Sequence, residues 1–129
     1  MSDKIKYQLE IEVKSSTKVL YNMISTPSGL SEWFADDVNI KNDVFTFFWD
    51  GSSEEAKLIT KRKGEAIKFQ WLEDFEDGEK TYFELAIKVD ELTNDVALMV
   101  TDFAEEDEMD EAKLLWTNQI DDLKKVIGS

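Results

Sequence analysis

The side chains that most often carry chemistry are scarce in this sequence of 129 residues, which contains no histidine and no cysteine. The usual general base, the commonest metal ligand and every thiolate nucleophile are therefore excluded. Carboxylates and aromatic side chains are what remains for a functional site. This composition favours a binding protein over an enzyme, and we expect no cofactor.

Two groups of carboxylates are candidates for a cation site or for acid–base work. Asp36, Asp37 and Asp50 would hold a cation only if the fold brings them together, and residues 102–111, "DFAEEDEMDE", are almost all acidic. Neither group has the glycine and the alternating ligands of a calcium loop. No carboxylate pair is marked by apolar neighbours as an acid–base pair. We interpret both groups as solvated surface and predict no metal site and no catalytic residue.

An aromatic pair stands out in the segment "TPSGLSEWFADDV", residues 26–38. Trp33 and Phe34 follow a break at Pro27 and precede two aspartates. The pair either gates a ligand cavity that opens or plugs the hydrophobic core. The plug is favoured, because aromatic pairs in proteins are most often structural.

The elements that would position these residues follow from the apolar spacing. Residues 4–14 alternate strictly and predict a half-buried strand with Tyr7 on its apolar face. Two short helices follow, the second of them starting at Ser28 and containing the aromatic pair. About six antiparallel strands come next, separated by turn signals such as Asp50-Gly51 and Asp77-Gly78.

The C-terminal segment changes from the period of a strand to the period of a helix. Apolar residues recur at steps of three and four from Met109 to Ile127, which predicts a helix over about 108–127 with Asp107 as its N-cap. This is the only expected element long enough to cover a sheet. The expected fold class is α+β, with a curved antiparallel sheet wrapped around this helix.

Three segments in order resemble the START-like (helix-grip, Bet v 1-like) family: "MISTPSGLSEWFADDV", "FTFFWDG" and "AKLLWTNQIDDLKKVIG". Nearly the whole chain resembles the group related to the Aha-type activator of the heat-shock chaperone ATPase. The resemblance implies one domain over residues 1–129, with seven strands, two short helices after the first strand, and a hydrophobic cavity between sheet and helix. It does not fix an activity, because relatives include lipid binders, pollen allergens, polyketide cyclases and chaperone activators.

A set of large apolar side chains is aimed toward the expected helix or lies on it, and we predict that this set, with the aromatic pair, forms the ligand-binding site. Its members are Trp33, Phe34, Phe47, Trp49, Phe69, Trp71, Leu85, Met99, Trp116 and Ile120. The alternative is that the same side chains fill the core, and their number and size favour that alternative. Buried indole N–H groups need acceptors in either case.

The charge and the flanking segments limit the partners. The net charge of −14, from 29 acidic and 15 basic residues, disfavours binding to nucleic acid and to anionic membranes. The sequence contains no apolar run near the length of a membrane span, about 20 residues. With no export signal at its N-terminus, the chain is expected in the cytoplasm.

Three functions remain open on the sequence alone. We favour a non-enzymatic domain that binds a small hydrophobic molecule or lipid. The second is a protein-interaction module with an acidic surface, like the chaperone activators. The third is a cyclase-type or hydratase-type enzyme, which a buried carboxylate at the cavity wall would support. The chain is expected to be a monomer or a homodimer.

Overall fold

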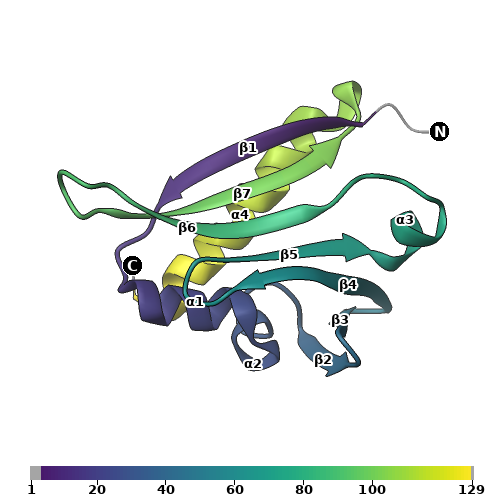
Figure 1. Cartoon of the computed structure of the whole chain (residues 1–129), viewed down its shortest axis with the longest axis horizontal. Coiled ribbons are helices and arrows are strands. Elements are labelled where there is room, and N and C mark those ends of the chain that lie inside the picture. The colour runs from purple at the N-terminus through teal and green to yellow at the C-terminus, as the bar shows by residue number, and fades with distance from the viewer. Residues whose placement is uncertain (1–3, 129) are drawn as a thin grey trace.

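The computed structural model describes residues 4–128, which form one curved antiparallel sheet of seven strands wrapped around a long helix (Figure 1). The order across the sheet is β1-β7-β6-β5-β4-β3-β2. The strands are β1 (Ile5–Glu12), β2 (Asp37–Lys41), β3 (Val44–Trp49), β4 (Ser52–Arg62), β5 (Ala66–Trp71), β6 (Phe83–Val89) and β7 (Val96–Ala104). The helices are α1 (Thr17–Ser25), α2 (Pro27–Leu30), α3 (Leu72–Glu76), the 3₁₀ turn η1 (Glu106–Glu108) and α4 (Met109–Ile127). The predicted helix-grip fold is confirmed.

The first and last strands lie side by side. Strand β1 pairs antiparallel with β7, with Tyr7 opposite Asp102 and Leu9 opposite Val100. Alternation along β1 buries Tyr7 on the concave side, as the sequence predicts. All other neighbours in the sheet are also neighbours in the chain, so hairpins build the rest of it.

Helix α4 covers the concave face with one apolar stripe. It spans Met109–Ile127, one residue shorter than predicted at its N-terminus, and ends at Gly128 with φ of 74°. The side chains of the stripe belong to the hydrophobic core or pack against it, and they are Met109, Ala112, Trp116, Ile120, Leu123 and Ile127. Asp107 is not the N-cap, because the 3₁₀ turn Glu106–Glu108 precedes the helix and Glu108 occupies the cap position without a side-chain hydrogen bond.

The aromatic pair is not helical, contrary to the prediction. Helix α2 begins at Pro27, because the Thr26 hydroxyl accepts a hydrogen bond from the Gly29 N–H at 2.9 Å and proline suits the first helical position. The helix ends at Leu30, four residues before the predicted end. Trp33 and Phe34 therefore lie in the turn that leads to β2.

Helix α3 was not predicted from the sequence. It has five residues, follows β5 directly, and has no side-chain cap, so no periodic or capping signal marks it. Among residues 4–128, no helix is both long and apolar enough to cross a membrane.

The contact between α1 and α2 fixes the path of the chain toward the aromatic pair and depends on Gly29. A Cβ at this position would overlap the carbonyl oxygen of Asn22 and lie 2.7 Å from Cα of Met23. We expect Gly29→Ala to lower the free energy of unfolding by about 1–3 kcal/mol, as overpacking usually does. Urea denaturation is the measurement, and Ser28→Ala, at an exposed position of the same helix, is the control. Equal midpoints for the two variants would contradict the close packing.

Candidate functional site

A groove of about 360 Å³ opens to solvent between α4 and one end of the sheet. Strand β3 contributes Trp49, β4 contributes Glu54 and β5 contributes Trp71. The complete lining is Phe34, Trp49, Glu54, Trp71, Asp102, Leu115, Trp116 and Gln119. Each strand residue lies on the concave face, because Phe47, Ala56 and Phe69, two residues away on the same strands, are fully buried.

Phe34 forms the centre of the aromatic cluster behind this groove. Its ring is stacked on Trp116 at a centroid distance of 5.6 Å and contacts Phe47 and Trp49 at 5.0 and 5.8 Å. Its carbonyl oxygen accepts hydrogen bonds from the indole of Trp49 at 3.0 Å and from the amide of Gln119 at 3.3 Å. Phe34 is 4% exposed, which agrees with a plug rather than an open gate.

Trp33 is buried on the other side of the same turn. Its indole N–H donates to the backbone oxygen of Met23 at 2.9 Å, and its ring meets Phe34 edge to face. Trp33 lines a separate hollow of about 610 Å³, which also includes Glu32, Asp122 and Lys125. The two hollows share Phe34, Trp49 and Gln119, so they are neighbours.

The structure divides the predicted ligand-binding set into four groups. Four of its members line the groove: Phe34, Trp49, Trp71 and Trp116. Trp33 lines only the neighbouring hollow of these two. Four more are fully buried in the core: Phe47, Phe69, Leu85 and Ile120. The interior beneath the groove is therefore packed with side chains, as the filled-core alternative predicts.

Met99 is a correction to the predicted set. It pairs with Glu10 and Ala86, while its neighbours Leu98 and Val100 are fully buried in the core. Successive residues of a strand point to opposite faces, so Met99 lies on the convex face, away from the helix.

Asp102 is the polar residue that sequence reasoning missed. It belongs to the acidic run that the sequence assigns to solvated surface, yet its side chain lies at the groove wall. One carboxylate oxygen accepts from the Trp116 indole at 2.8 Å, and the other accepts from the backbone N–H of Phe103 at 2.8 Å. Alternation along β7 places Asp102 on the same face as Leu98 and Val100, but the strand is apolar on both faces, so its sequence alone does not show that this face is the concave one.

Burial perturbs the acidity of Asp102 and of its neighbour Tyr7. Loss of solvation raises the pKa of the Asp102 carboxyl, and the hydrogen bonds from Trp116 and Phe103 offset only part of that rise. Burial, followed by the charge of Asp102, raises the pKa of the Tyr7 phenol. The Tyr7 hydroxyl is buried close to Asp102 and Trp116, without a hydrogen bond of good geometry to the described part of the chain.

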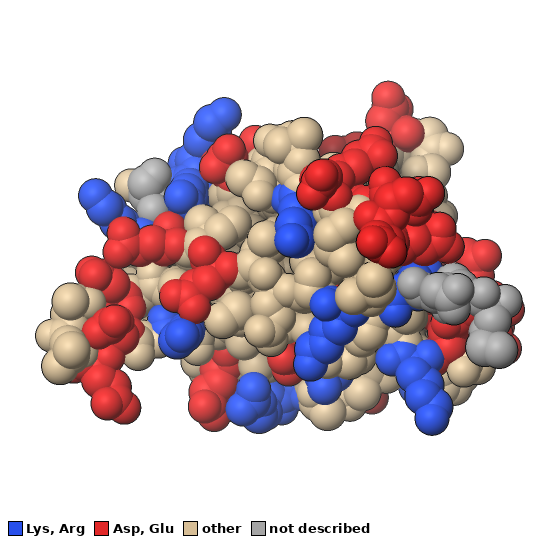
Figure 2. Space-filling model, turned by 90° about the horizontal axis from the view of Figure 1, so that it is seen from above, with Lys and Arg blue, Asp and Glu red and all other residues tan. Residues whose placement is uncertain are grey.

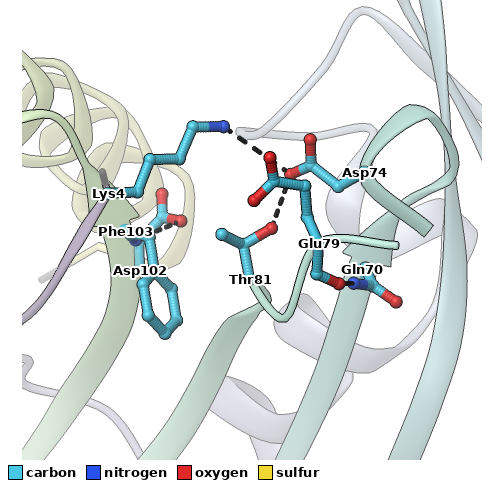
Figure 3. Close-up of polar contacts among 7 residues, drawn as sticks. All are labelled: Lys4, Gln70, Asp74, Glu79, Thr81, Asp102 and Phe103. Atoms are coloured by element: carbon cyan, nitrogen blue, oxygen red, sulfur yellow. Dashed lines mark hydrogen bonds and ion pairs between the residues drawn. The ribbon is translucent and has the colours of Figure 1, made fainter. Parts of the chain in front are cut away.

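A set of polar contacts beside the groove connects α3 and the segment after it to β1 and β5. Lys4, just before β1, reaches Asp74 of α3 (Figure 3), and the distance between its ammonium nitrogen and the carboxylate oxygen is 3.8 Å. Asp74 also accepts a hydrogen bond from the Thr81 hydroxyl at 2.7 Å. The Gln70 amide donates to the backbone oxygen of Glu79 at 2.8 Å. The ammonium of Lys4 is thereby directed to α3 rather than into the groove.

The two groups of carboxylates singled out in the sequence differ in how closely the fold brings their members together. Among residues 4–128, those close enough to share a cation are Glu105, Asp107 and Glu108, whose oxygens lie within 4.8 Å of one another. Asp36, Asp37 and Asp50 form no such group in this range. Figure 2 shows a dense group of acidic side chains at one end of the face seen from above. Asp107 and Glu108 are exposed and Glu105 is half-buried, so we interpret Glu105, Asp107 and Glu108 as acidic surface.

The fold and the sequence together decide the family. The model of the START-like superfamily domain matches residues 1–129. The chain belongs to the START-like superfamily. A similar solved structure is that of BfR322 from Bacteroides fragilis, with 38% identity, coverage of 95% of this chain and 90% of that chain, and a TM-score of 0.68. The resemblance stated from the sequence is thus confirmed.

More distant structures share the START-like fold. The Aha1 dimer from Colwellia psychrerythraea is 18% identical, with coverage of 95% of this chain and 96% of that chain and a TM-score of 0.79. XoxI from Bacillus cereus is 11% identical, with coverage of 98% and 96% and a TM-score of 0.76. At such identities the likeness concerns the fold alone. No curated protein matches this START-like chain significantly.

The plug interpretation predicts a large loss of stability when Phe34 is truncated. Phe34→Ala should lower the free energy of unfolding by about 3–5 kcal/mol, because it empties a buried aromatic site. Phe75→Ala is the matched control, since Phe75 is 47% exposed and should cost no more than about 1 kcal/mol. Urea denaturation measures both. A variant Phe34→Ala as stable as wild type would indicate a gate that opens readily.

The raised pKa of Asp102 predicts a pH dependence of stability with a definite sign. The folded state holds the proton of Asp102 more tightly than the unfolded state, so this group favours folding most at low pH. The stability of wild type relative to Asp102→Asn should therefore fall as the pH rises from the ordinary carboxyl range through the raised pKa. Unfolding of both proteins between about pH 4 and 7 is the measurement. A difference that rises with pH would contradict the burial effect.

Proposed function

We propose that this START-like domain binds a small hydrophobic molecule in the groove between α4 and the β3–β5 end of the sheet. The observation that carries the proposal is the groove itself, about 360 Å³ in volume, with three indoles and the Phe34 ring in its lining. Binding sites for small molecules are typically concave and mostly apolar, with a few polar groups that orient the ligand. Asp102, Glu54 and Gln119 are suited to that orienting role.

Binding is favoured over catalysis by the state of Asp102. Both of its oxygens already accept hydrogen bonds, from the Trp116 indole and from the Phe103 N–H. These two bonds use about half of the acceptor sites of a carboxylate and hold the group in place. The other polar residues of the groove lining are Glu54 and Gln119, and Glu54 comes from β4, which β5 and β6 separate from the β7 strand of Asp102. No second carboxylate, histidine or cysteine of this lining therefore lies beside Asp102 to share acid–base work. The carboxylate is better suited to orient Trp116 and to give the groove its charge.

An interaction module is the second candidate, and one feature favours it. Leu114 and Leu115 on α4 are each 60% exposed, next to the acidic residues at the start of the helix. Exposed apolar side chains rimmed by charge are typical of contact surfaces. This alternative predicts that the groove binds no small apolar probe.

The test uses the neutral apolar dye N-phenyl-1-naphthylamine and the indole N–H signals in NMR spectra. The signals of Trp49, Trp71 and Trp116 should shift on titration, while the signal of Trp33, bonded to Met23, should move less. Dye fluorescence excited through tryptophan gives the affinity.

A matched pair of variants locates the binding. Leu115 lines the groove and Leu114 does not, although both are 60% exposed on the same helix. Leu115→Ala should weaken dye binding by about threefold or more, since it removes apolar contact area, while Leu114→Ala should leave it unchanged. Equal affinities for the two variants, or no shift at the groove indoles, would contradict the proposed function.

A further inference from the structure

The groove carries a charge as well as an apolar lining, and the two together define a class of ligand. We propose that the ligand is an organic ammonium ion with an apolar body. This inference rests on the proposed function and names the chemistry of its ligand.

Three indoles converge on the groove from different elements. Trp49 comes from β3, Trp71 from β5 and Trp116 from α4, and the rings of Trp49 and Trp71 are 6.4 Å apart between centroids. The face of an indole attracts a cation more strongly than any other aromatic side chain does, within about 6 Å of the ring. Several such rings around one space are a recognised arrangement for quaternary ammonium groups.

Two carboxylates complete the lining. Glu54 lies on the concave face of β4 and Asp102 on that of β7. Neither forms an ion pair with a lysine or arginine within residues 4–128. A carboxylate left without a basic partner beside an aromatic groove favours a cationic ligand and repels an anionic one.

The basic side chains near the groove do not lie in its lining. The charge of Lys4 acts on Asp102 and offsets part of the rise in its pKa, but the two side chains form no ion pair, and Lys125 lines the neighbouring hollow. Lys4 pairs with Asp74 at 3.8 Å, and the ammonium of Lys113 lies over the Tyr7 ring at 5.9 Å from its centroid. Neither residue lines the groove. The cation that the indoles and carboxylates would attract is therefore not supplied by these lysines.

The neighbouring hollow gives room for an apolar body. It measures about 610 Å³ and shares Phe34, Trp49 and Gln119 with the groove. A substituent on an ammonium head among the indoles could extend past Phe34 into this hollow. The apolar members of the hollow's lining are Trp33, Phe34, Ala35, Trp49 and Val126, and Glu32, Asp36, Asp122 and Lys125 also belong to it. A chain of several carbons can reach these apolar side chains, whereas a compact ion cannot.

The test compares three probes with the same six-carbon chain and different heads: hexyltrimethylammonium, 1-hexanol and hexanoate. NMR shifts of the indole N–H groups and calorimetry measure binding. We expect hexyltrimethylammonium to bind about tenfold or more tightly than 1-hexanol, because desolvated cation–aromatic contacts reach that size. Hexanoate should bind most weakly.

The protein has a net charge of −14 and attracts cations over its whole surface. Two matched pairs of variants distinguish cation binding in the groove from that general attraction. Leu115→Lys places a positive charge at the groove, and Leu114→Lys places the same charge outside it. Glu54→Gln removes a groove carboxylate, and Glu55→Gln removes one from the opposite face of β4. We expect the first of each pair to weaken cation binding at least threefold more than its control does.

The outcomes distinguish this inference from the proposed function. If 1-hexanol binds the groove as tightly as the ammonium probe, the inference is overturned and the proposed function stands. If none of the three probes shifts the groove indoles, both are overturned. If the ammonium probe binds more tightly but each variant matches its control, the attraction belongs to the whole surface, and the inference is again overturned.

Discussion

One backbone oxygen joins the parts on which the groove depends. The carbonyl of Phe34 accepts hydrogen bonds from Trp49 of β3 and from Gln119 of α4, while its ring stacks on Trp116. Turn, sheet and helix are therefore fixed at one residue. Both hollows include Phe34 in their linings, so the shape of any ligand site here is set by how this turn packs. The position of this turn depends on α2. Helix α2 can approach α1 closely because Gly29 has no side chain.

The fold could be predicted from the sequence because its signals repeat. Alternation over many residues gave the strands, and a stripe at steps of three and four gave α4 to within one residue. The bounds of short helices were harder to predict, because few residues mark where such a helix begins and ends. The predicted end of α2 was wrong because Trp33 and Phe34 continue the apolar spacing of a helix, although the helix itself ends at Leu30. Helix α3 was missed because five residues without a cap give no period to detect.

The site was predictable only in part, and β7 shows the physical reason. Ala97 and Thr101 on its convex face are as well buried as many core residues, so both faces of this strand read as apolar. Alternation then has no preferred direction, and Met99 was assigned to the wrong face. The pairing with β6 and β1 supplies the direction, and it also turns Asp102 toward the helix. That information lies in the tertiary contacts of the strand and not in its own sequence.

The burial of Asp102 connects the stability of this domain with its binding chemistry. Removing a carboxylate from water is unfavourable, as the raised pKa indicates, and the Trp116 hydrogen bond recovers only part of that free energy. An apolar residue at this position would avoid the loss of solvation, but it would leave the buried Trp116 N–H without an acceptor. The carboxylate therefore satisfies and orients the Trp116 indole in the folded domain, with or without a ligand. Its negative potential beside three aromatic rings has no such structural role, and under the proposed function it would favour a positively charged ligand.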